Sequence, residues 1–339
     1  MRLMIYNHHD ESTRLKRIGV LVNDHLVGDL RAAYARYLVE KAGNNIGREI
    51  AALCFPSTIT DFLRIGPAAW EMAALTLNCL TEWAHSDVTA TGLDDERLLI
   101  RLADCQLHAP VRPGKLIMAG RNYANHLKER GHAPPMRVPT SWIKANSAVI
   151  GPTHDICRPA VEKRLDYETE LALVIGRKCK NVPEHEAYDV IAGYLILNDV
   201  TARDILKVEH DEGNKLLGKM SDTFAPAGPW LVSKNEIPDP MNLRIVTRVN
   251  GEIRQDSSTR NMIWSIPKLI AYLSQMTIEA GDIIATGSPE GVAGGRKPGE
   301  TPWWLNPGDI LESEIENIGV LRNRIIDDST PGKQWTWNL

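Results

Sequence analysis

The stretch YETELALVIG, residues 167–176, decides the fold of this chain. Its second half alternates small and large apolar residues and ends at a glycine, which predicts a half-buried β-strand. Successive side chains of a strand point to opposite faces. Glu168 and Glu170 should therefore lie side by side on one face, followed on that face by Ala172 and Val174.

Two neighbouring carboxylates beside an apolar face repel each other and lose hydration, so one of them should keep its proton. A divalent cation removes this cost, because ions such as Mg²⁺ take carboxylate oxygens as ligands. An edge strand whose acidic face is solvated explains the same pattern equally well. From this stretch alone both interpretations stay open.

A third carboxylate favours the metal site. The run AGYLILND, residues 192–199, is typical of a second buried strand that ends at Asp199. Burying an unpaired acid is costly, so an acid in this position usually has a purpose. If the two strands are neighbours, Asp199 could complete a three-carboxylate site with Glu168 and Glu170. The alternative is an N-cap on a helix that begins near Thr201, a role that Asp204 could also fill.

Composition excludes several classes of protein. The chain has 339 residues and a formal net charge of −4, with both charge signs well mixed. Mild acidity without a basic run argues against a nucleic-acid or anionic-membrane partner. The N-terminus has no long apolar core, so no signal peptide is predicted, and no uninterrupted apolar run is long enough to cross a bilayer. The five cysteines are scattered without a C-x-x-C pair, which fits a reducing compartment, so we expect a cytoplasmic protein.

The sequence predicts two domains that meet near Arg112. Residues 18–30 predict a hairpin that turns at Asn23-Asp24, and residues 31–41 and 67–85 predict helices. The following polar stretch ends in APVRPG, residues 109–114. We therefore expect a smaller N-terminal α/β accessory domain at residues 1–112 and a catalytic domain at residues 113–339.

The second domain is predicted to be rich in β-structure. Leu116 to Gly120 has the pattern of a short buried strand, and Asn250-Gly251 between two strand-like runs predicts a type I′ hairpin. Residues 265–276 predict one helix. Crossover helices between the strands are missing, so we expect an α+β fold rather than a doubly wound parallel sheet.

Four further residues have reactive side chains in suggestive places. His126 and Glu129 are three apart, so on a helix they share a face, where the carboxylate would orient the imidazole as a general base. Lys144 and Lys219 are lone cations among apolar or small residues, suited to holding a substrate oxyanion. A surface helix contact and two solvated lysines are the ordinary alternatives.

Together these stretches resemble the fumarylacetoacetate hydrolase family. The resemblance covers about Lys115 to Ile326, in family order. It rests on five motifs: GRNYAxHxxE at 120–129, ETELALVIG at 168–176, NDVTARD at 198–204, GKMSDTF at 218–224 and GDIIATGSPEG at 281–291.

The resemblance implies a fold, a metal site and a set of residue roles. The fold would be a roll of mixed β-sheets, usually assembled as a homodimer. Mg²⁺ or Mn²⁺ would be held by Glu168, Glu170 and Asp199. The predicted catalytic residues are His126, Glu129 and Lys219, and the predicted substrate-binding residues are Arg121, Tyr123, Lys144, Arg203 and Thr286. The proline-rich segment from His132 to Thr140 falls where the family often has a lid.

The chain differs from the larger eukaryotic-type enzymes of the family, and the difference indicates which branch it resembles. Those enzymes have a substrate-contacting glutamine two positions after the A-R-D triplet, where this chain has Leu206. No counterpart of their additional aspartate ligand precedes His126. The chain is therefore more similar to the acylpyruvase-type branch, with three carboxylate ligands.

The resemblance predicts a hydrolase that cleaves a carbon–carbon bond in a 2,4-dioxo acid such as an acylpyruvate. Water deprotonated by His126 would attack the distal carbonyl, and the resulting enolate would be stabilised by the metal and Lys219. Decarboxylation of a 2-oxo dicarboxylate or dehydration of a 2-keto-3-deoxy sugar acid at the same site is the alternative, and a non-catalytic ligand-binding protein is the rival from another class. The tryptophans at 303, 304, 335 and 337 are candidates for a homodimer interface or for packing within the chain.

Overall fold

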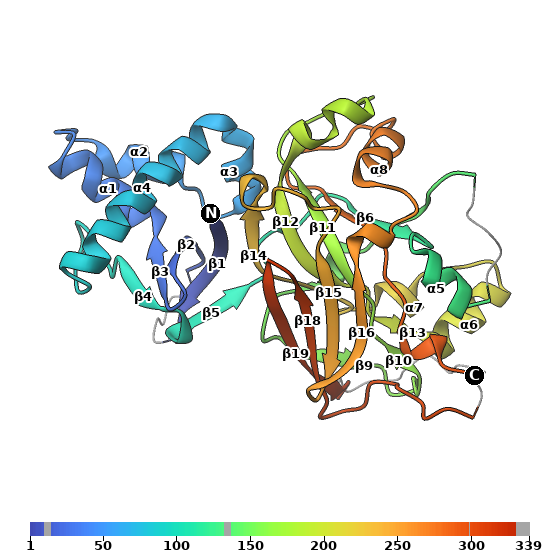
Figure 1. The fold of residues 1–339 in the computed structure, drawn as a ribbon. Helices are drawn as coiled ribbons and strands as arrows, with labels where there is room; N and C mark the ends of the chain where they lie inside the picture. The colour runs from blue at the N-terminus through green and yellow to red at the C-terminus, as the bar shows by residue number, and fades with distance from the viewer. Residues whose placement is uncertain (10–14, 132–136, 298, 330–339) are drawn as a thin grey trace.

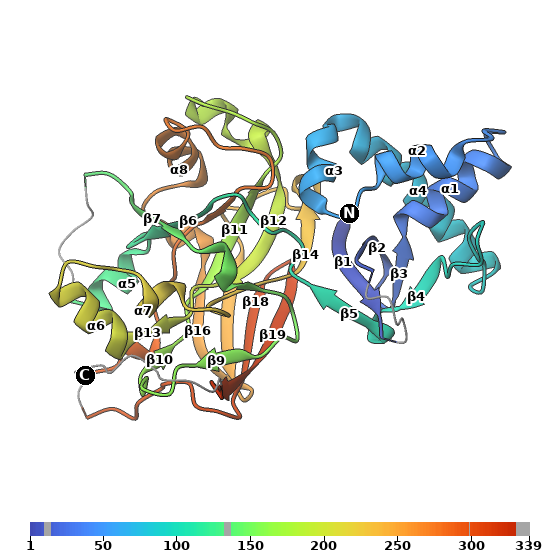
Figure 2. The same cartoon turned by 180° about the vertical axis from the view of Figure 1, so that it is seen from behind.

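The structure is a computed structural model that describes residues 1–9, 15–131, 137–297 and 299–329. Two lobes lie side by side, the smaller built from the N-terminal part of the chain (Figures 1 and 2). The strands of the first lobe are β1 (Arg2–His8), β2 (Arg17–Asn23), β3 (Leu26–Asp29), β4 (Leu99–Arg101) and β5 (Cys105–His108). Its helices are α1 (Leu30–Glu40), α2 (Gly47–Cys54), α3 (Ile59–Ile65) and α4 (Pro67–Ser86).

The second lobe follows from β6 onward. Its strands are β6 (Leu116–Gly120), β7 (Thr140–Lys144), β8 (Val149–Ile150), β9 (Ile156–Arg158), β10 (Leu165–Asp166), β11 (Thr169–Ile175), β12 (Ile191–Asn198), β13 (Thr201–Ala202), β14 (Ala225–Ser233), β15 (Arg244–Val249), β16 (Glu252–Ser258), β17 (Ile283–Ala285), β18 (Ile310–Ile315) and β19 (Gly319–Asp327). Its α-helices are α5 (Ala124–Glu129), α6 (Arg203–Asp211), α7 (Leu217–Met220) and α8 (Ile266–Leu273).

Two large sheets form the framework. The first runs in the order β4-β3-β2-β1-β14-β12-β11-β17-β6-β7, with β5 paired to β1 and β8 paired to β14. The second runs β16-β15-β18-β19-β9. Most neighbours are antiparallel, while β17 with β6, β8 with β14 and β9 with β19 are parallel. The expected β-rich α+β fold with mixed sheets is confirmed.

Strand β11 lies inside the framework, with β12 on one side and β17 on the other. Ala172 and Val174 belong to one hydrophobic core, whereas Leu171 and Leu173 belong to a second core that includes residues of β15, β18 and β19. Every residue of β11 is buried, so the expectation of a half-buried strand is wrong. The second sheet covers the face of Leu171 and Leu173, a long-range contact that the local alternation does not predict.

The first lobe shares the large sheet with the second, because β1 pairs with β14 through Arg2 with Val232 and Leu3 with Leu231. The predicted hairpin is confirmed as β2 and β3, and α1 and α4 match the two predicted helices within one or two residues. Asp29 caps α1 by accepting a hydrogen bond from the Ala32 amide. The domain boundary near Arg112 stays a prediction.

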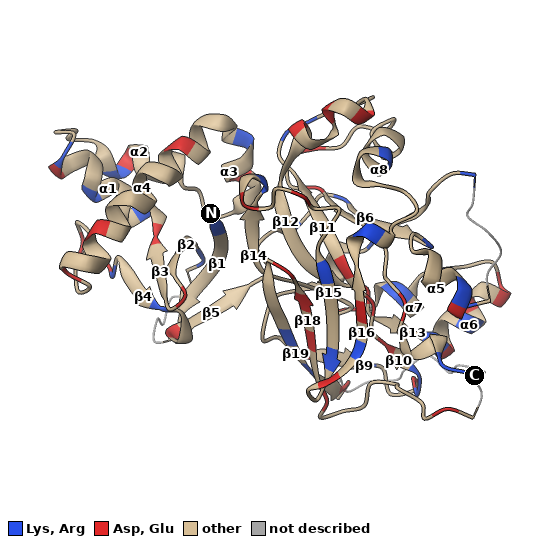
Figure 3. Ribbon diagram, viewed as in Figure 1, with Lys and Arg blue, Asp and Glu red and all other residues tan. Residues whose placement is uncertain are grey.

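Local turn chemistry is confirmed in the second lobe. Asn250 and Gly251 both have positive φ, 52° and 82°, as a type I′ turn between β15 and β16 requires. Helix α8 has a proline in its first turn, where no backbone N–H is needed. Charged residues of both signs are distributed over both lobes (Figure 3). Within the described residues, no helix combines the length and apolar character that a membrane crossing needs.

Candidate active site

The paired strands β11 and β12 bring three carboxylates together. Thr169 pairs with Asn198, so Glu168 and Asp199 are opposite each other just beyond the pairing, and the Asp199 amide donates to the Glu168 carbonyl at 2.8 Å. One oxygen from each of Glu168, Glu170 and Asp199 lies within 4.8 Å of the other two. All three residues are buried, so the solvated-edge alternative is wrong. The N-cap alternative for Asp199 is wrong as well, because Ala202 occupies the N-cap of α6.

Three cations surround two of these carboxylates. The Lys219 ammonium donates to both Glu168, at 2.9 Å, and Asp199. The Lys144 ammonium donates to the other oxygen of Asp199 at 2.6 Å, and Arg203 donates to Glu168 at 2.6 Å. Both lysines are almost fully buried, so the alternative of solvated lysines is wrong. Buried charges of this kind persist only when they are paired, and here each cation has a carboxylate partner.

Glu170 is the carboxylate with the least compensation. Its side chain accepts a hydrogen bond from the Gly287 amide at 2.8 Å. Burial raises the pKa of Glu170 well above its ordinary value, and Asp199 and Glu168 raise the pKa further. For Glu168, burial also raises the pKa, but Lys219 and Arg203 outweigh it and hold that pKa well below the ordinary value.

The residues present fit a divalent ion. Carboxylate oxygens are the ligands that Mg²⁺ and Mn²⁺ prefer, and three of them converge here from a rigid pair of strands. Glu170 is flanked by two further carboxylates, and a divalent charge at that point would stabilise its ionised form. Each carboxylate oxygen can accept from more than one partner, so the existing bonds to Lys219 and Arg203 do not exhaust the ligand atoms.

The predicted His126–Glu129 pair is present on α5. His126 Nδ1 lies 2.8 Å from Glu129 Oε1, and the other Glu129 oxygen accepts from the Gly291 amide at 2.9 Å. Glu129 is therefore fixed between α5 and the loop after β17. A carboxylate on Nδ1 selects the tautomer in which Nε2 has the free lone pair, which is the form that a general base needs.

Two of the carboxylates and the imidazole line one cavity of about 920 Å³. Glu168, Glu170, His126 and Lys219 line it, together with a ring of basic and aromatic side chains. That ring consists of Arg121, Arg130, Trp142, Arg164, Arg203, Lys207, His210, Lys215, Arg296, Lys297 and Trp304. The excess of basic groups around the acidic centre favours an anionic substrate.

The predicted substrate-binding residues fall into two groups. Arg121 and Arg203 line the cavity, and Arg121 has a left-handed backbone with φ of 56°, a strained conformation that is often found at functional sites. Tyr123, Lys144 and Thr286 are buried beneath it, and the Thr286 hydroxyl donates to the Leu171 carbonyl at 2.9 Å. Their contact with substrate stays a prediction.

Sequence reasoning missed several residues of this cavity. Lys215 lies with its ammonium 2.9 Å from the centre of the Trp142 ring, and Arg130 bonds to the Gly294 carbonyl. No sequence motif marked these residues, since only the folded loops bring them to the cavity. Leu206, at the position of the missing glutamine, also lines it.

The proposed lid and the predicted tryptophan surface lie partly outside the described residues. Of the proposed lid, residues 132–136 lie outside the described residues, while Thr140 lines the cavity. Trp335 and Trp337 also lie outside them. Trp303 stacks against Arg254 and Arg296, and Trp304 lines the cavity, so both tryptophans contact their own chain.

Comparison with known proteins shows which family the chain belongs to. Residues 115–326 match the family described as fumarylacetoacetate (FAA) hydrolase, C-terminal. The chain belongs to the fumarylacetoacetate hydrolase family. Its members are enzymes, among them hydrolases, isomerases and tautomerases.

Three relatives illustrate the range of this family. The human protein named oxaloacetate tautomerase FAHD2A, mitochondrial, is 38% identical over 274 residues, which is 80% of this chain and 80% of that protein. The crystal structure of 5-carboxymethyl-2-hydroxymuconate delta-isomerase from Mycobacterium smegmatis has 30% identity and a TM-score of 0.66, covering 97% of this chain and 100% of that one. Maleylpyruvate hydrolase from Sphingobium sp. SYK-6, in complex with manganese(II) and pyruvate, has 26% identity and a TM-score of 0.68, covering 96% and 99%.

Proposed function

We propose that this chain is a Mg²⁺- or Mn²⁺-dependent enzyme that moves a proton between the keto and enol forms of a 2-oxo dicarboxylic acid of the oxaloacetate type. One observation carries the proposal: His126, hydrogen-bonded to Glu129, lines the same cavity as two of the buried carboxylates and Lys219. The relatives named oxaloacetate tautomerase, at 35% to 42% identity, support this choice of reaction.

Different residues of the chain would bind the metal ion, bind the substrate and transfer the proton. Glu168, Glu170 and Asp199 would hold the ion, which when bound supplies a Lewis acid that polarises the 2-oxo group. Basic side chains of the cavity, Arg121 and Arg203 among them, would bind the carboxylates of the substrate. His126 Nε2 would take the proton from the carbon next to the carbonyl, while Glu129 stabilises the imidazolium that forms.

Proton transfer also needs the negative charge on oxygen to be stabilised. The buried Lys219 ammonium provides a fixed positive charge near the carbonyl of the bound acid. The electron pair of the broken C–H bond moves to that oxygen as the enolate forms. Return of the proton from His126 to carbon gives the keto form, and protonation on oxygen gives the enol.

Hydrolysis of a carbon–carbon bond in a 2,4-dioxo acid is the second candidate. A cavity of about 920 Å³ has room for an acyl group beyond a four-carbon acid, and His126 could equally deprotonate a water molecule. The likeness to maleylpyruvate hydrolase supports this candidate over nearly the whole chain. The enolate of pyruvate would then leave with the same stabilisation by Lys219.

A substrate panel separates the two candidates. Enol decay of oxaloacetate, cleavage of acylpyruvates, oxaloacetate decarboxylation and dehydration of keto-deoxy sugar acids would each be measured with Mg²⁺, with Mn²⁺ and with EDTA. We expect metal-dependent tautomerisation of oxaloacetate to be the fastest reaction. If cleavage of an acylpyruvate is faster, the hydrolase becomes the favoured function. If no compound shows metal-dependent turnover, both candidate functions are contradicted.

We also propose that the enzyme is a cytoplasmic homodimer formed mainly by the second domain, with the domain boundary near Arg112. The five cysteines are all unpaired, which fits a reducing compartment. Light scattering at micromolar concentration tests the dimer: a mass of about twice 37.8 kDa supports it, and a monomer contradicts it.

A further inference from the structure

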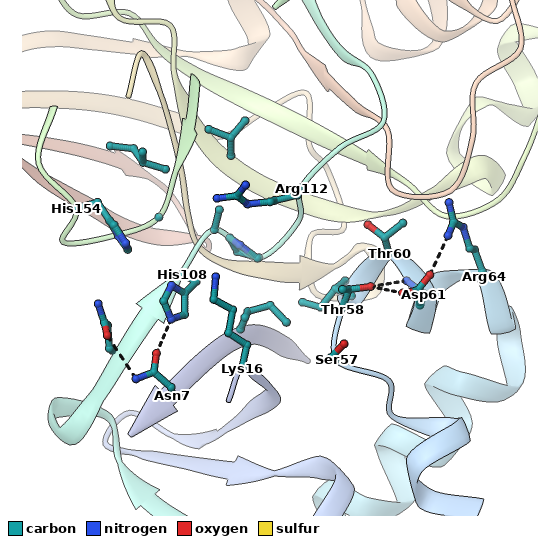
Figure 4. Close-up of a pocket in the computed structure, with 18 of the residues that line it drawn as sticks. Asn7, Lys16, Ser57, Thr58, Thr60, Asp61, Arg64, His108, Arg112 and His154 are labelled. Atoms are coloured by element: carbon teal, nitrogen blue, oxygen red, sulfur yellow. Dashed lines mark hydrogen bonds and ion pairs between the residues drawn. The ribbon is translucent and has the colours of Figure 1, made fainter. Parts of the chain in front are cut away.

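A second cavity lies between the two lobes, away from the candidate active site. Its volume is about 710 Å³, and its lining residues include none of those that line the active-site cavity. Asn7, helix α3 with the loop before it, and the segment from Gln106 to Arg112 form the wall on the side of the first lobe. Val149 to Gly151 and His154 form the wall on the side of the second lobe (Figure 4). We call it the interlobe cavity.

The charge of the interlobe cavity is positive. Lys16 and Arg112 line it, and no ion pair or hydrogen bond to either side chain is found among the described residues. Asp61 is the one acid among the described lining residues, and it forms an ion pair with Arg64 at 2.8 Å. At neutral pH, the described lining residues therefore have an excess of two positive charges, from Lys16 and Arg112.

His108 lies close to these basic side chains. His108 bonds through Nε2 to Asn7, and its ring centre lies 5.7 Å from that of His154 (Figure 4). Burial lowers the pKa of His108 to about 4, and Lys16, His154 and Arg112 act in the same direction. Lys16, Arg112 and His154 lie on three separate segments of the chain, yet all three are near enough to disfavour a further positive charge.

The lining also has the apolar surface that a carbon skeleton needs. Ile5 and Ile59 face the cavity from the first lobe, and Val149 and Ile150 from the second. The volume lies within the range of small-molecule sites, which are typically apolar with a few convergent polar groups. A bare inorganic ion would leave this apolar part of the wall without a partner.

We propose that the interlobe cavity binds a small organic anion, with Lys16 and Arg112 contacting its carboxylate or phosphate groups and the isoleucines and Val149 contacting its carbon atoms. The site is distinct from the proposed catalytic site and takes its ligand at the junction of the lobes. Because both lobes line it, an occupied site would hold β5 and the segment after β8 together.

Calorimetric titration of the full chain tests this proposal, with citrate, glycerol 3-phosphate and inorganic phosphate as the probes. We expect one organic probe to bind saturably with one site per chain. The double variant Lys16→Gln/Arg112→Gln should weaken that binding about a hundredfold, because two charge-assisted hydrogen bonds are lost. Tighter binding of citrate would identify a carboxylate ligand, and tighter binding of glycerol 3-phosphate would identify a phosphate ester.

The basic active-site cavity could bind the same probes, so Arg121→Gln serves as the matched control. It removes one positive charge from the other cavity, and binding should stay within about twofold of the original chain. Loss of binding in Arg121→Gln but not in the double variant would overturn the proposal. Binding weaker than about 10 mM for every probe, or binding of inorganic phosphate as tight as both organic probes, would overturn it as well.

Discussion

Asp29 in the first lobe and Glu170 in the second are both carboxyls with about 1% of their surface exposed. Burial raises the pKa of each, but their surroundings differ. Asp29 accepts from the Ala32 amide at 2.9 Å and from the Tyr6 hydroxyl at 3.0 Å, so its role in the first turn of α1 explains its position. Glu170 lies beside Glu168 and Asp199, and no capping or folding role explains three adjacent carboxylates.

The comparison shows which buried charges point to function. A buried acid that completes a helix end lowers the free energy of the fold, whereas a cluster of buried like charges raises it. Such a cluster is maintained when it serves binding or catalysis. Lys219, Lys144 and Arg203 offset part of the cost in the second lobe. Glu170 forms no ion pair with a described residue, and a divalent ion would stabilise its ionised form.

The largest expected effect is the loss of activity when one carboxylate of the cluster is neutralised. Asp199→Asn keeps the shape of the side chain but removes a ligand charge, so turnover of the preferred substrate should fall about a thousandfold or more. Asp29→Asn is the matched change in the first lobe, and it should leave turnover within about twofold, because asparagine is an equally good N-cap. Steady-state kinetics would contradict the comparison if both variants lost activity equally.

Removal of the general base should have the next largest effect. His126→Ala should lower turnover about a hundredfold or more, because no other described residue has been placed to take the proton. His85→Ala, on the exposed end of α4, should have no effect and controls for histidine loss. Full activity of His126→Ala alongside inactive carboxylate variants would show that the base has been assigned wrongly.

A structural role for Asp29 predicts an effect on stability rather than activity. Asp29→Ala removes the cap of α1 and leaves the buried Tyr6 hydroxyl without its acceptor, so the free energy of unfolding should fall by about 2 kcal/mol. Denaturant unfolding measures this change. An unchanged midpoint, or lost turnover in a fully folded Asp29→Ala variant, would remove the contrast with Glu170.

The smallest expected effect concerns pH. Burial, with a further contribution from Lys219, lowers the pKa of Lys215 to about 7. The side chain is therefore charged below about pH 7 and neutral above it, so its attraction for an anionic substrate is lost as the pH rises. We expect KM to increase about threefold between about pH 6 and pH 8. Lys215→Arg stays charged and should flatten this rise; an identical pH profile would exclude Lys215 as its cause.

Local patterns predicted much of the fold and the main elements of the site. The alternation in β11, the acid at the end of β12 and the Asn250-Gly251 turn depend on neighbours in sequence, and each was found where expected. The second sheet over Leu171 and Leu173 could not be predicted in this way. Short helices such as α2 and α3 were also missed, because they follow no long periodic pattern.

The partners of the site residues were the least predictable part. The spacing of Glu168 and Glu170 indicated a shared face, but the Gly287 amide that contacts Glu170 comes from a loop 117 residues further along the chain. The position of Lys215 over Trp142 likewise depends on how the loop between α6 and α7 is brought against β7. The positive interlobe cavity is formed by segments of both lobes and has no local sequence signature.

Binding of Mn²⁺ tests the central claim most directly. Calorimetry or electron paramagnetic resonance should find one Mn²⁺ per chain, and Glu170→Gln should weaken its binding about a hundredfold or more while the circular dichroism spectrum stays unchanged. Glu129→Gln, the same substitution just outside the cluster, should bind Mn²⁺ like the original chain. Equal Mn²⁺ affinity in the original chain and in Glu170→Gln would contradict a metal site built from Glu168, Glu170 and Asp199.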